Sequence, residues 1–312
     1  MSRSDQVHGL KRPLAGTSEA AILRAVRAAA TAVGLPAAGA TVLRCSSSTL
    51  VTLPQAKAVA RLFPQRRAAT ARREIDVAVI LRAAGVPAAR LVGSGDQPVA
   101  TGCGPVTFWG WLTPVDAPVT AATLGALARR LHHATAGRTA LRPADPLGAA
   151  RALLDEPQAI RRCEPRDLRL LHTVLDRYSE AWADVVAADP LGQAVIHADL
   201  HSDNVVSTAS GPYLVDLELA GTGPCSYDLA PLAVATRRYG APPQLDAASR
   251  RTAPIRDPGT ASSSCAMSTK RGPPPGRWRT PQGPMTPTPR PHCGSTAGAT
   301  AHRHRGHGTD RP

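Results

Sequence analysis

The stretch that decides the fold is His197-Ala-Asp-Leu-His-Ser-Asp-Asn204, and an aspartate follows twelve residues later in Leu214-Val-Asp-Leu-Glu218. An apolar run at residues 194–196 precedes the first segment, and another at residues 213–215 precedes the aspartate. Short apolar runs bounded by turn residues predict buried strands. We therefore expect two strands that each deliver polar side chains into the loop where the strand ends.

The polar side chains of these loops suit the transfer of a phosphoryl group. Asp199 is placed to accept the proton of an attacking hydroxyl, and Asn204 and Asp216 offer the oxygen ligands that Mg²⁺ prefers. In such sites positioning and charge neutralisation do most of the catalysis. A single Asp or Asn is more often a turn residue that bonds its own backbone, but the joint spacing of all three favours the catalytic interpretation.

The two segments resemble the signature of the aminoglycoside phosphotransferase and choline-kinase-like family, and Gly223-Pro-Cys-Ser-Tyr-Asp-Leu-Ala230 resembles that family's following segment. The resemblance covers about residues 15–245 and is strongest at 195–232. It implies a two-lobed, protein-kinase-like α+β fold, with a small antiparallel-sheet N-lobe and a mainly helical C-lobe. It also implies an ATP- or GTP-dependent phosphotransferase that acts on a hydroxyl of an aminoglycoside-like molecule, an amino alcohol or a sugar.

The resemblance assigns a role to each residue of the signature. By it, Asp199 is the catalytic base, Asn204 and Asp216 are ligands of the magnesium ion, and His197 and Asp228 support the loop. These roles are expectations that follow from the resemblance.

Two neighbouring positions, 198 and 218, differ from the family pattern or have more than one expected role. Ala198 stands where the family usually has Gly, a substitution that costs little unless the backbone there needs a positive φ. Glu218 is expected either to touch a second metal ion or to be solvated or bonded within its loop.

A kinase-like fold also needs a cation on the third strand that pairs with a glutamate of the adjacent helix. Arg61 in the segment 58–62 and Glu74 in the segment 71–74 occupy these places. Arginine presents a planar fork where lysine presents a point charge, although some relatives resemble this chain in carrying arginine. Lys57 is the fallback, and a surface strand residue is the alternative interpretation of Arg61.

Further nucleotide contacts are predicted at two places. Ser47 and Ser48 lie in a serine turn where the family covers the phosphates, and small polar residues offer N–H groups and hydroxyls there. Trp109 and Trp111 fall at the connector between the lobes, where the adenine edge should meet backbone groups. Core packing explains these aromatic residues equally well.

The remaining pattern predicts alternating elements. Apolar periodicity, caps and glycine stops predict strands at 41–43, 50–53, 58–63, 89–92, 106–111, 193–196, 205–207 and 213–215, and helices at 18–33, 66–84, 121–135, 166–187 and 227–239. In the helix at 166–187, the repeat at Leu168, Leu171, Leu175, Tyr178, Trp182 and Val185 predicts a core-facing stripe. The pair His132-His133 reads as the polar end of a helix.

The chain is expected to divide into a nucleotide-binding lobe at 1–112, a helical lobe with the catalytic and metal loops at 113–246, and a tail at 247–312. The formal net charge is +14, of which +9 belongs to the tail. The tail contains no Leu, Val or Phe, so it cannot bury enough apolar area to fold, and we predict disorder there. We hypothesise that it is the product of a frameshift in a GC-rich gene. Alternative frames that encode no amphipathic helices would contradict this.

Two other functions compete with the kinase. His197-Ala-Asp-Leu-His201 resembles a fragment of a metal-dependent hydrolase, although such a site needs further ligands from later strands. Alternatively, the body is an inactive kinase-like module whose basic tail binds nucleic acid through phosphate contacts. The presence of Asp199, Asn204 and Asp216 together argues against inactivity, and the concentration of charge in the tail argues against a nucleic-acid function for the body.

The composition indicates the cellular compartment of the protein and its relation to membranes. The six cysteines are scattered without a CxxC pair, which predicts neither a disulfide framework nor a zinc site and favours a reducing cytoplasm. Polar residues interrupt every apolar run before it reaches membrane-spanning length. The resemblance implies a nucleotide and a small hydroxylated acceptor as partners, and the interrupted apolar runs predict no membrane.

Overall fold

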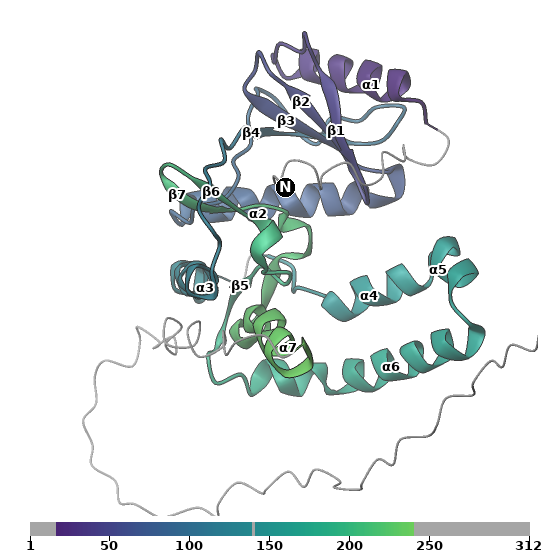
Figure 1. Cartoon of the computed structure of the whole chain (residues 1–312), viewed down its shortest axis with the longest axis vertical. Helices are drawn as coiled ribbons and strands as arrows, with labels where there is room; N and C mark the ends of the chain where they lie inside the picture. The colour runs from purple at the N-terminus through teal and green to yellow at the C-terminus, as the bar shows by residue number, and fades with distance from the viewer. Residues whose placement is uncertain (1–16, 139–140, 240–312) are drawn as a thin grey trace, which may run out of the picture. The chain divides into compact units, whose positions relative to one another are not determined.

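The computed structural model describes residues 17–138 and 141–239. Figure 1 shows a strand-rich part that is followed along the chain by a mainly helical part. Within the described residues, the helical part also contains two two-stranded sheets. The predictions for residues 247–312, namely disorder, a nucleic-acid-binding tail and a frameshift product, lie outside the described residues.

A four-stranded antiparallel sheet forms the first part of the chain. Its strands are adjacent in sequence order: β1 (Thr41–Cys45), β2 (Thr49–Leu53), β3 (Ala58–Leu62) and β4 (Val106–Gly110). The predicted strands at 41–43, 50–53, 58–63 and 106–111 are thus present, with ends that differ by one or two residues.

The alternation of side chains along β3 divides the sheet into two faces. Ala58, Ala60 and Leu62 are buried in one apolar cluster with helix α1 (Glu19–Ala32). Successive side chains of a strand point to opposite faces, so Arg61 points away from α1, toward the side on which its partners lie. The two-residue alternation of side chains along β3 therefore determines the face of the sheet on which Arg61, the predicted cation, lies.

Helix α2 (Ala68–Ala83) follows a short 3₁₀ turn, η2 (Gln65–Arg67), and ends before Gly85, which has a φ of +68°. Its residues Val77 and Leu81 are fully buried in a second apolar cluster, which includes helix α3 (Ala121–Thr135). The helix thus packs against the second part of the chain and carries Glu74 on a buried face.

The predicted strand at 89–92 is wrong as a regular strand. The segment makes only an isolated bridge between Leu91 and Trp109, and Ala88 bridges to Leu214 instead. Directly after it, Gly93 has a φ of +94°, which takes the backbone out of the extended conformation. The sheet therefore stays four-stranded.

The second part contains more helices than the sequence predicted. Its elements are α3, α4 (Pro146–Leu154), α5 (Pro157–Arg162), α6 (Pro165–Ala187), β5 (Gln193–Ile196), η3 (Ser202–Asn204), β6 (Val205–Thr208), β7 (Gly211–Leu214), η4 (Leu217–Leu219), β8 (Gly221–Pro224), η5 (Cys225–Leu229) and α7 (Ala230–Tyr239). Helices α4, α5 and α6 all begin at a proline. Proline at the first helical position lacks only an N–H that would be unpaired anyway, so these residues start helices here. The predicted helix at 227–239 begins with the 3₁₀ turn η5.

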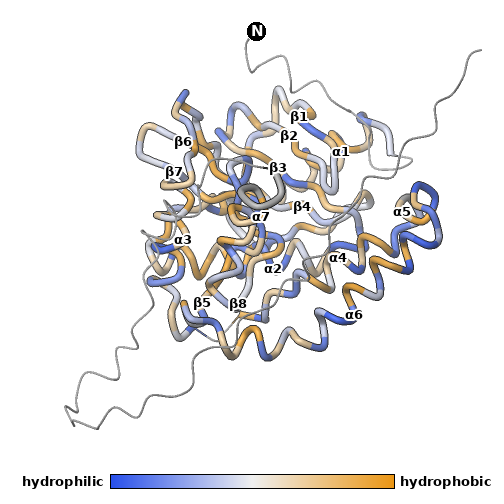
Figure 2. The backbone as a smooth tube through the Cα atoms, turned by 60° about the horizontal axis from the view of Figure 1, so that its bottom comes forward, coloured by the Kyte–Doolittle hydropathy of each residue, from blue (hydrophilic) through white to orange (hydrophobic). Residues whose placement is uncertain are grey.

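The predicted core-facing stripe of helix α6 is present only in part. Leu168, Leu175 and Trp182 are partly buried, and the Trp182 ring packs edge-on against Tyr227. The other half of the stripe is open, because Leu171, Tyr178 and Val185 are 42%, 59% and 50% exposed. Figure 2 shows apolar and polar residues alternating along α6, so the amphipathic pattern itself is present. Such a pattern establishes that one face is apolar, but it does not establish that another element lies over that face.

Two further observations bear on the setting. Among the described residues, no helix is both long enough and apolar enough to cross a membrane. Cys45, Cys103, Cys163 and Cys225 are free thiols.

Candidate active site

A short antiparallel pair, β5 and β8, brings the signature segment to its position. Val195 and Ile196 are fully buried, and the chain leaves β5 directly into His197. The His197 ring is also buried, and its Nε2 lies 2.9 Å from the carbonyl oxygen of Val215, so Nε2 donates the hydrogen bond. This bond ties the start of the signature segment to the residue that precedes Asp216.

Asp228 fixes the backbone at the same point. Its Oδ2 accepts from the His197 N–H at 3.0 Å and lies 2.9 Å from His132 Nε2, while Oδ1 accepts from the Ala198 N–H at 2.8 Å. Burial disfavours the charged form of this carboxylate, but the hydrogen bond from His132 and its other partners lower its pKa overall. The geometry agrees with the predicted supporting role of Asp228.

Ala198 sits in a left-handed conformation, with a φ of +64°. A residue with a Cβ pays about 1–2 kcal/mol for this conformation, which glycine adopts freely. The departure from the family's glycine is therefore a strained one here, and the backbone hydrogen bond to Asp228 holds it in place.

Asp199 and Asn204 are in direct contact. The Asn204 amide nitrogen Nδ2 donates to the Asp199 backbone oxygen at 2.9 Å and to the carboxylate oxygen Oδ2 at 3.0 Å. The Asp199 side chain is 49% exposed, whereas Asn204 is buried. The arrangement presents a solvent-accessible carboxylate whose orientation is set by a buried amide.

The β6–β7 hairpin brings Asp216 to the same place. Val205 pairs with Leu214, and the Val215 N–H donates to the Asn204 carbonyl oxygen at 3.0 Å, so the next residue, Asp216, lies beside Asn204. Asp216 has a φ of +62°, a conformation that Asp and Asn tolerate better than other residues with a side chain. The spacing in the sequence thus becomes a spatial cluster.

Arg61 reaches this cluster from the opposite part of the chain. Its guanidinium nitrogen Nη1 lies 2.6 Å from Glu74 Oε1 and 2.9 Å from Asp216 Oδ1, and its Nε donates to Ser48 Oγ at 2.9 Å. The fallback cation, Lys57, is exposed in the turn before β3. The predicted pair of Arg61 and Glu74 is therefore the one that the structure brings together.

The ionisation of this pair reflects its surroundings. Burial opposes the charge on Arg61, but attraction to Glu74, Asp216 and Glu218 raises its pKa above the ordinary value. Burial also raises the pKa of the Glu74 carboxyl to about 7. Both directions are expected where carboxylates outnumber cations in a buried cluster.

The remaining predicted contacts divide into two groups. Ser48 is buried with its hydroxyl bonded to Arg61, and Ser47 is exposed with its carbonyl oxygen 3.4 Å from Arg67 Nη1. Trp109 is buried in the second apolar cluster, with its indole N–H bonded to Thr107, while Trp111 is 44% exposed. Core packing therefore accounts for Trp109, and only Trp111 offers its ring to a ligand.

The metal-dependent hydrolase gains no support from this geometry. His197 Nε2 is committed to a backbone carbonyl, and His201 Nε2 lies 3.6 Å from Asp199 Oδ2 and 3.0 Å from Asn204 Nδ2. Within residues 17–138 and 141–239, no group of three His, Cys, Asp or Glu side chains is arranged to hold a metal ion.

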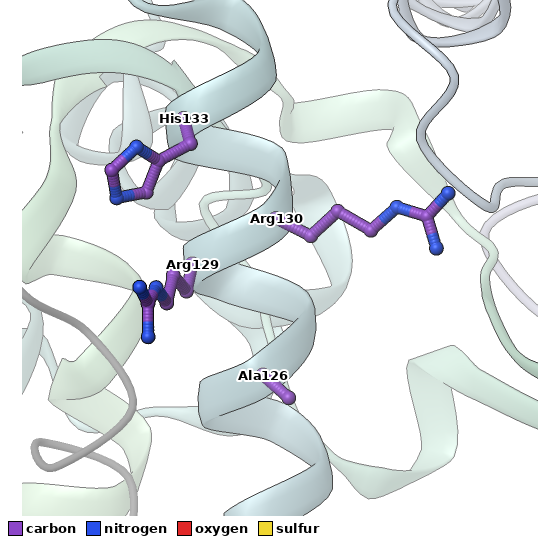
Figure 3. A pocket seen from close by; sticks show the side chains of 4 residues that line it. All are labelled: Ala126, Arg129, Arg130 and His133. Atoms are coloured by element: carbon purple, nitrogen blue, oxygen red, sulfur yellow. The ribbon is translucent and has the colours of Figure 1, made fainter.

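Two surface hollows lie apart from this cluster. One, of about 280 Å³, is lined by Ala126, Arg129, Arg130 and His133 of α3. Figure 3 shows Arg129 and His133 on one side of the helix and Arg130 on the other, so these side chains do not converge. The second, of about 380 Å³, includes Arg82, Arg90 and Tyr213 in its lining. Neither hollow is lined by a predicted site residue.

Comparison with known proteins identifies the family. The model of the family described as "Phosphotransferase enzyme family" matches residues 46–261, which is more than half of the chain. The chain belongs to this phosphotransferase family, and the resemblance seen in the sequence is confirmed. No curated protein matches the chain significantly.

Solved structures confirm the two-lobed, protein-kinase-like fold. Aminoglycoside phosphotransferase APH(3'')-Id from Streptomyces rimosus, in complex with ADP and streptomycin, has a TM-score of 0.57 at 18% identity, over 76% of this chain and 92% of that one. Choline kinase LicA from Streptococcus pneumoniae has a TM-score of 0.52 at 11% identity, over 76% and 82%. The amicoumacin kinase hAmiN, with AMP-PNP and Ca²⁺, has a TM-score of 0.51 at 16% identity, over 68% and 70%.

Two contributors to the site, His132 and Glu218, were given other roles in the sequence analysis, and a third, Arg67, was missed. His132, read as a polar helix end, is 3% exposed and bonds Asp228. Glu218 bonds Arg61 and Arg67, and Arg67 was not considered at all. A histidine on the apolar stripe of the helix at 121–135 was a usable signal for His132, but nothing in the local sequence points to the Arg67 contact.

Proposed function

We propose that this protein transfers the terminal phosphoryl group of ATP or GTP, used with Mg²⁺, to a hydroxyl group of a small molecule. The observation that carries the proposal is one cluster: Asn204 orients the accessible carboxylate of Asp199, and the adjacent Asp216 meets Arg61, which is paired with Glu74. Phosphoryl transfer depends on such positioning together with charge neutralisation.

The oxygen atoms of Asn204 and Asp216 fit a magnesium ion. Asp216 Oδ1 lies 2.9 Å from Arg61 Nη1, and the Asp216 side chain is 29% exposed, so the carboxylate is open to a cation while Arg61 holds it in place. The Nδ2 of Asn204 is occupied by Asp199, so its carbonyl oxygen is the atom left for a cation. Magnesium prefers such oxygen ligands and completes its shell with water and phosphate oxygens. When bound, it supplies positive charge that offsets the charge of the phosphates.

The protein side chains then have separate tasks. Asp199 accepts the proton of the acceptor hydroxyl, which its exposure allows the acceptor to reach. Arg61 donates hydrogen bonds to phosphate oxygens, in an orientation set by Glu74 and Ser48. Backbone groups of the turn containing Ser47 and the ring of Trp111 are the proposed remaining nucleotide contacts.

The acceptor class is proposed from the relatives. Their names specify streptomycin, amicoumacin and choline as the compounds concerned. We propose an aminoglycoside-like molecule, an amino alcohol or a sugar as the acceptor of this chain, each of which carries a hydroxyl that Asp199 can deprotonate.

Asp216→Asn tests the proposed metal ligand while it keeps the backbone, because Asn also tolerates the left-handed conformation. We expect binding of magnesium nucleotide to weaken by at least roughly 10–100-fold, because that is the loss typical when only the partners that orient a metal ligand are changed. Isothermal titration calorimetry with ATP and with GTP, with and without Mg²⁺ and in the absence of an acceptor, measures this.

Asp203→Asn is the matched control, because Asp203 is an exposed carboxylate in the same region. It should bind nucleotide as the wild type does. Failure of the wild type to bind either magnesium nucleotide would contradict the proposed function. Unchanged binding by Asp216→Asn would remove Asp216 from the metal site.

A further inference from the structure

Arg67 is the last residue of η2 and stands directly before α2. Its Nη2 lies 3.0 Å from Glu218 Oε1, and its Nη1 donates to the Ser47 carbonyl oxygen at 3.4 Å. The Arg67 side chain is 22% exposed, whereas that of the neighbouring Arg66 is 67% exposed. The two adjacent arginines thus differ in side-chain exposure and in their partners. Of the two, Arg67 is the one that joins the serine turn to the loop that carries Asp216.

Glu218 is shared between two arginines. Its Oε1 pairs with Arg67, and its Oε2 lies 2.5 Å from Arg61 Nη2. Arg61 Nη1 is already paired with Glu74 and Asp216. The outer nitrogen of Arg61, which a nucleotide phosphate would need, is therefore held by Glu218.

The charges of this cluster do not balance. Three carboxylates (Glu74, Asp216 and Glu218) face two guanidinium groups (Arg61 and Arg67), which leaves an excess of one negative charge when all are ionised. Removal of Arg67 would leave an excess of two next to the place proposed for the nucleotide phosphates. It would also release Oε1 of Glu218, so that both oxygens of this carboxylate could approach Arg61 Nη2, the nitrogen that Glu218 already contacts.

We propose that Arg67 is a positioning residue for nucleotide binding, because it restrains Glu218, the carboxylate that competes with phosphate for Arg61. The inference rests on the proposed function. With one oxygen of Glu218 held by Arg67, the contact from Glu218 to Arg61 stays single, and phosphate oxygens can displace it. Arg67 itself contacts Glu218 and does not contact the nucleotide.

The experiment measures the Kd of magnesium nucleotide by calorimetry, without acceptor, for wild type, Arg67→Gln, Arg67→Lys, Glu218→Gln and Arg67→Gln/Glu218→Gln. Arg67→Gln should bind about tenfold more weakly, the cost of about one charged hydrogen bond. Arg67→Lys keeps the charge beside Glu218 and should stay within about threefold of the wild type. Arg66→Gln, which removes an exposed pair with Glu156, should bind as the wild type does.

The Glu218→Gln background separates this inference from a structural role. With the competing carboxylate gone, removing Arg67 should change the Kd by less than about threefold, and the double variant should bind more tightly than Arg67→Gln alone. A thermal unfolding control on every variant establishes that it is folded before its Kd is compared. A double variant much weaker than Glu218→Gln would overturn the inference, because Arg67 would then act on phosphate directly or through the fold. Equal Kd values for wild type and Arg67→Gln would also overturn it, while the proposed function would stand. Absence of nucleotide binding by the wild type would overturn both.

Discussion

Asp199→Asn is expected to lower the turnover number by about 10²–10⁴-fold, the contribution typical of a positioned general base. An amide cannot accept the proton of the acceptor hydroxyl at neutral pH. Its carbonyl oxygen can still accept the hydrogen bond that Asn204 Nδ2 gives to Asp199 Oδ2 at 3.0 Å, so the loop should keep its shape. Steady-state kinetics with the acceptor found by a nucleotide-consumption screen give the turnover number.

The affinity for magnesium nucleotide should change little in this variant, because the proposed nucleotide contacts lie on other residues. Asp203→Asn again supplies the matched control and should keep its turnover. A turnover number for Asp199→Asn within about threefold of the wild type would be incompatible with a base.

Asp228→Asn is expected to destabilise the protein by about 3–5 kcal/mol, the cost typical of breaking a buried charged cluster from one side. Asp228 is 1% exposed, and the His197 and Ala198 N–H groups and His132 all converge on its two oxygens. Asparagine has one acceptor oxygen, and its amide group would face a donor. The midpoint of urea unfolding, followed by circular dichroism at pH 7, measures the loss.

The pH dependence of the same residue has a definite sign. The folded protein lowers the pKa of Asp228, so its stabilising contribution is present above the ordinary carboxyl range and is lost as the pH falls through the lowered value. The difference between wild type and Asp228→Asn should therefore shrink in acid. Asp189 also accepts several bonds, from Leu191 and Ser226, but is partly exposed. Asp189→Asn should cost less, and an equal cost for both variants would contradict the special role of Asp228.

The parts of the site that were predictable depend on short-range rules. The spacing between Asn204 and Asp216 suits a hairpin, and the hairpin forms with Val205 opposite Leu214. The side-chain alternation of a strand places Arg61 opposite the α1 face and toward Glu74. Local periodicity and known spacing were sufficient for these contacts.

The parts that were missed depend on packing between distant segments. His132 meets Asp228 across 96 residues, and Arg67 meets Glu218 across 151. Neither separation leaves a periodic signal in the sequence. The same limit explains α6, whose apolar stripe was visible although its exposure was not, because a helix pattern carries no information about the element that covers it.

The sequence predicted backbone strain at Ala198 only on the condition that the φ of this residue is positive. Alanine costs little there unless the backbone needs a positive φ, and the structure has such a φ, at +64°. The pKa of the Glu74 carboxyl, which burial raises to about 7 with smaller contributions from Asp216 and Glu218, also required the fold, because both burial and these neighbours come from distant segments.

The central claim is that a phosphoryl group passes from a nucleotide to a hydroxyl on an acceptor with Asp199 as base. Phosphorus NMR of wild type and Asp199→Asn, incubated with magnesium ATP or GTP and a panel of aminoglycosides, amino alcohols and sugars, tests it directly. The account predicts that a phosphomonoester signal grows with the nucleoside diphosphate in the wild type and falls by about 10²-fold or more in the variant. Release of inorganic phosphate alone, or equal phosphomonoester formation by both proteins, would contradict it.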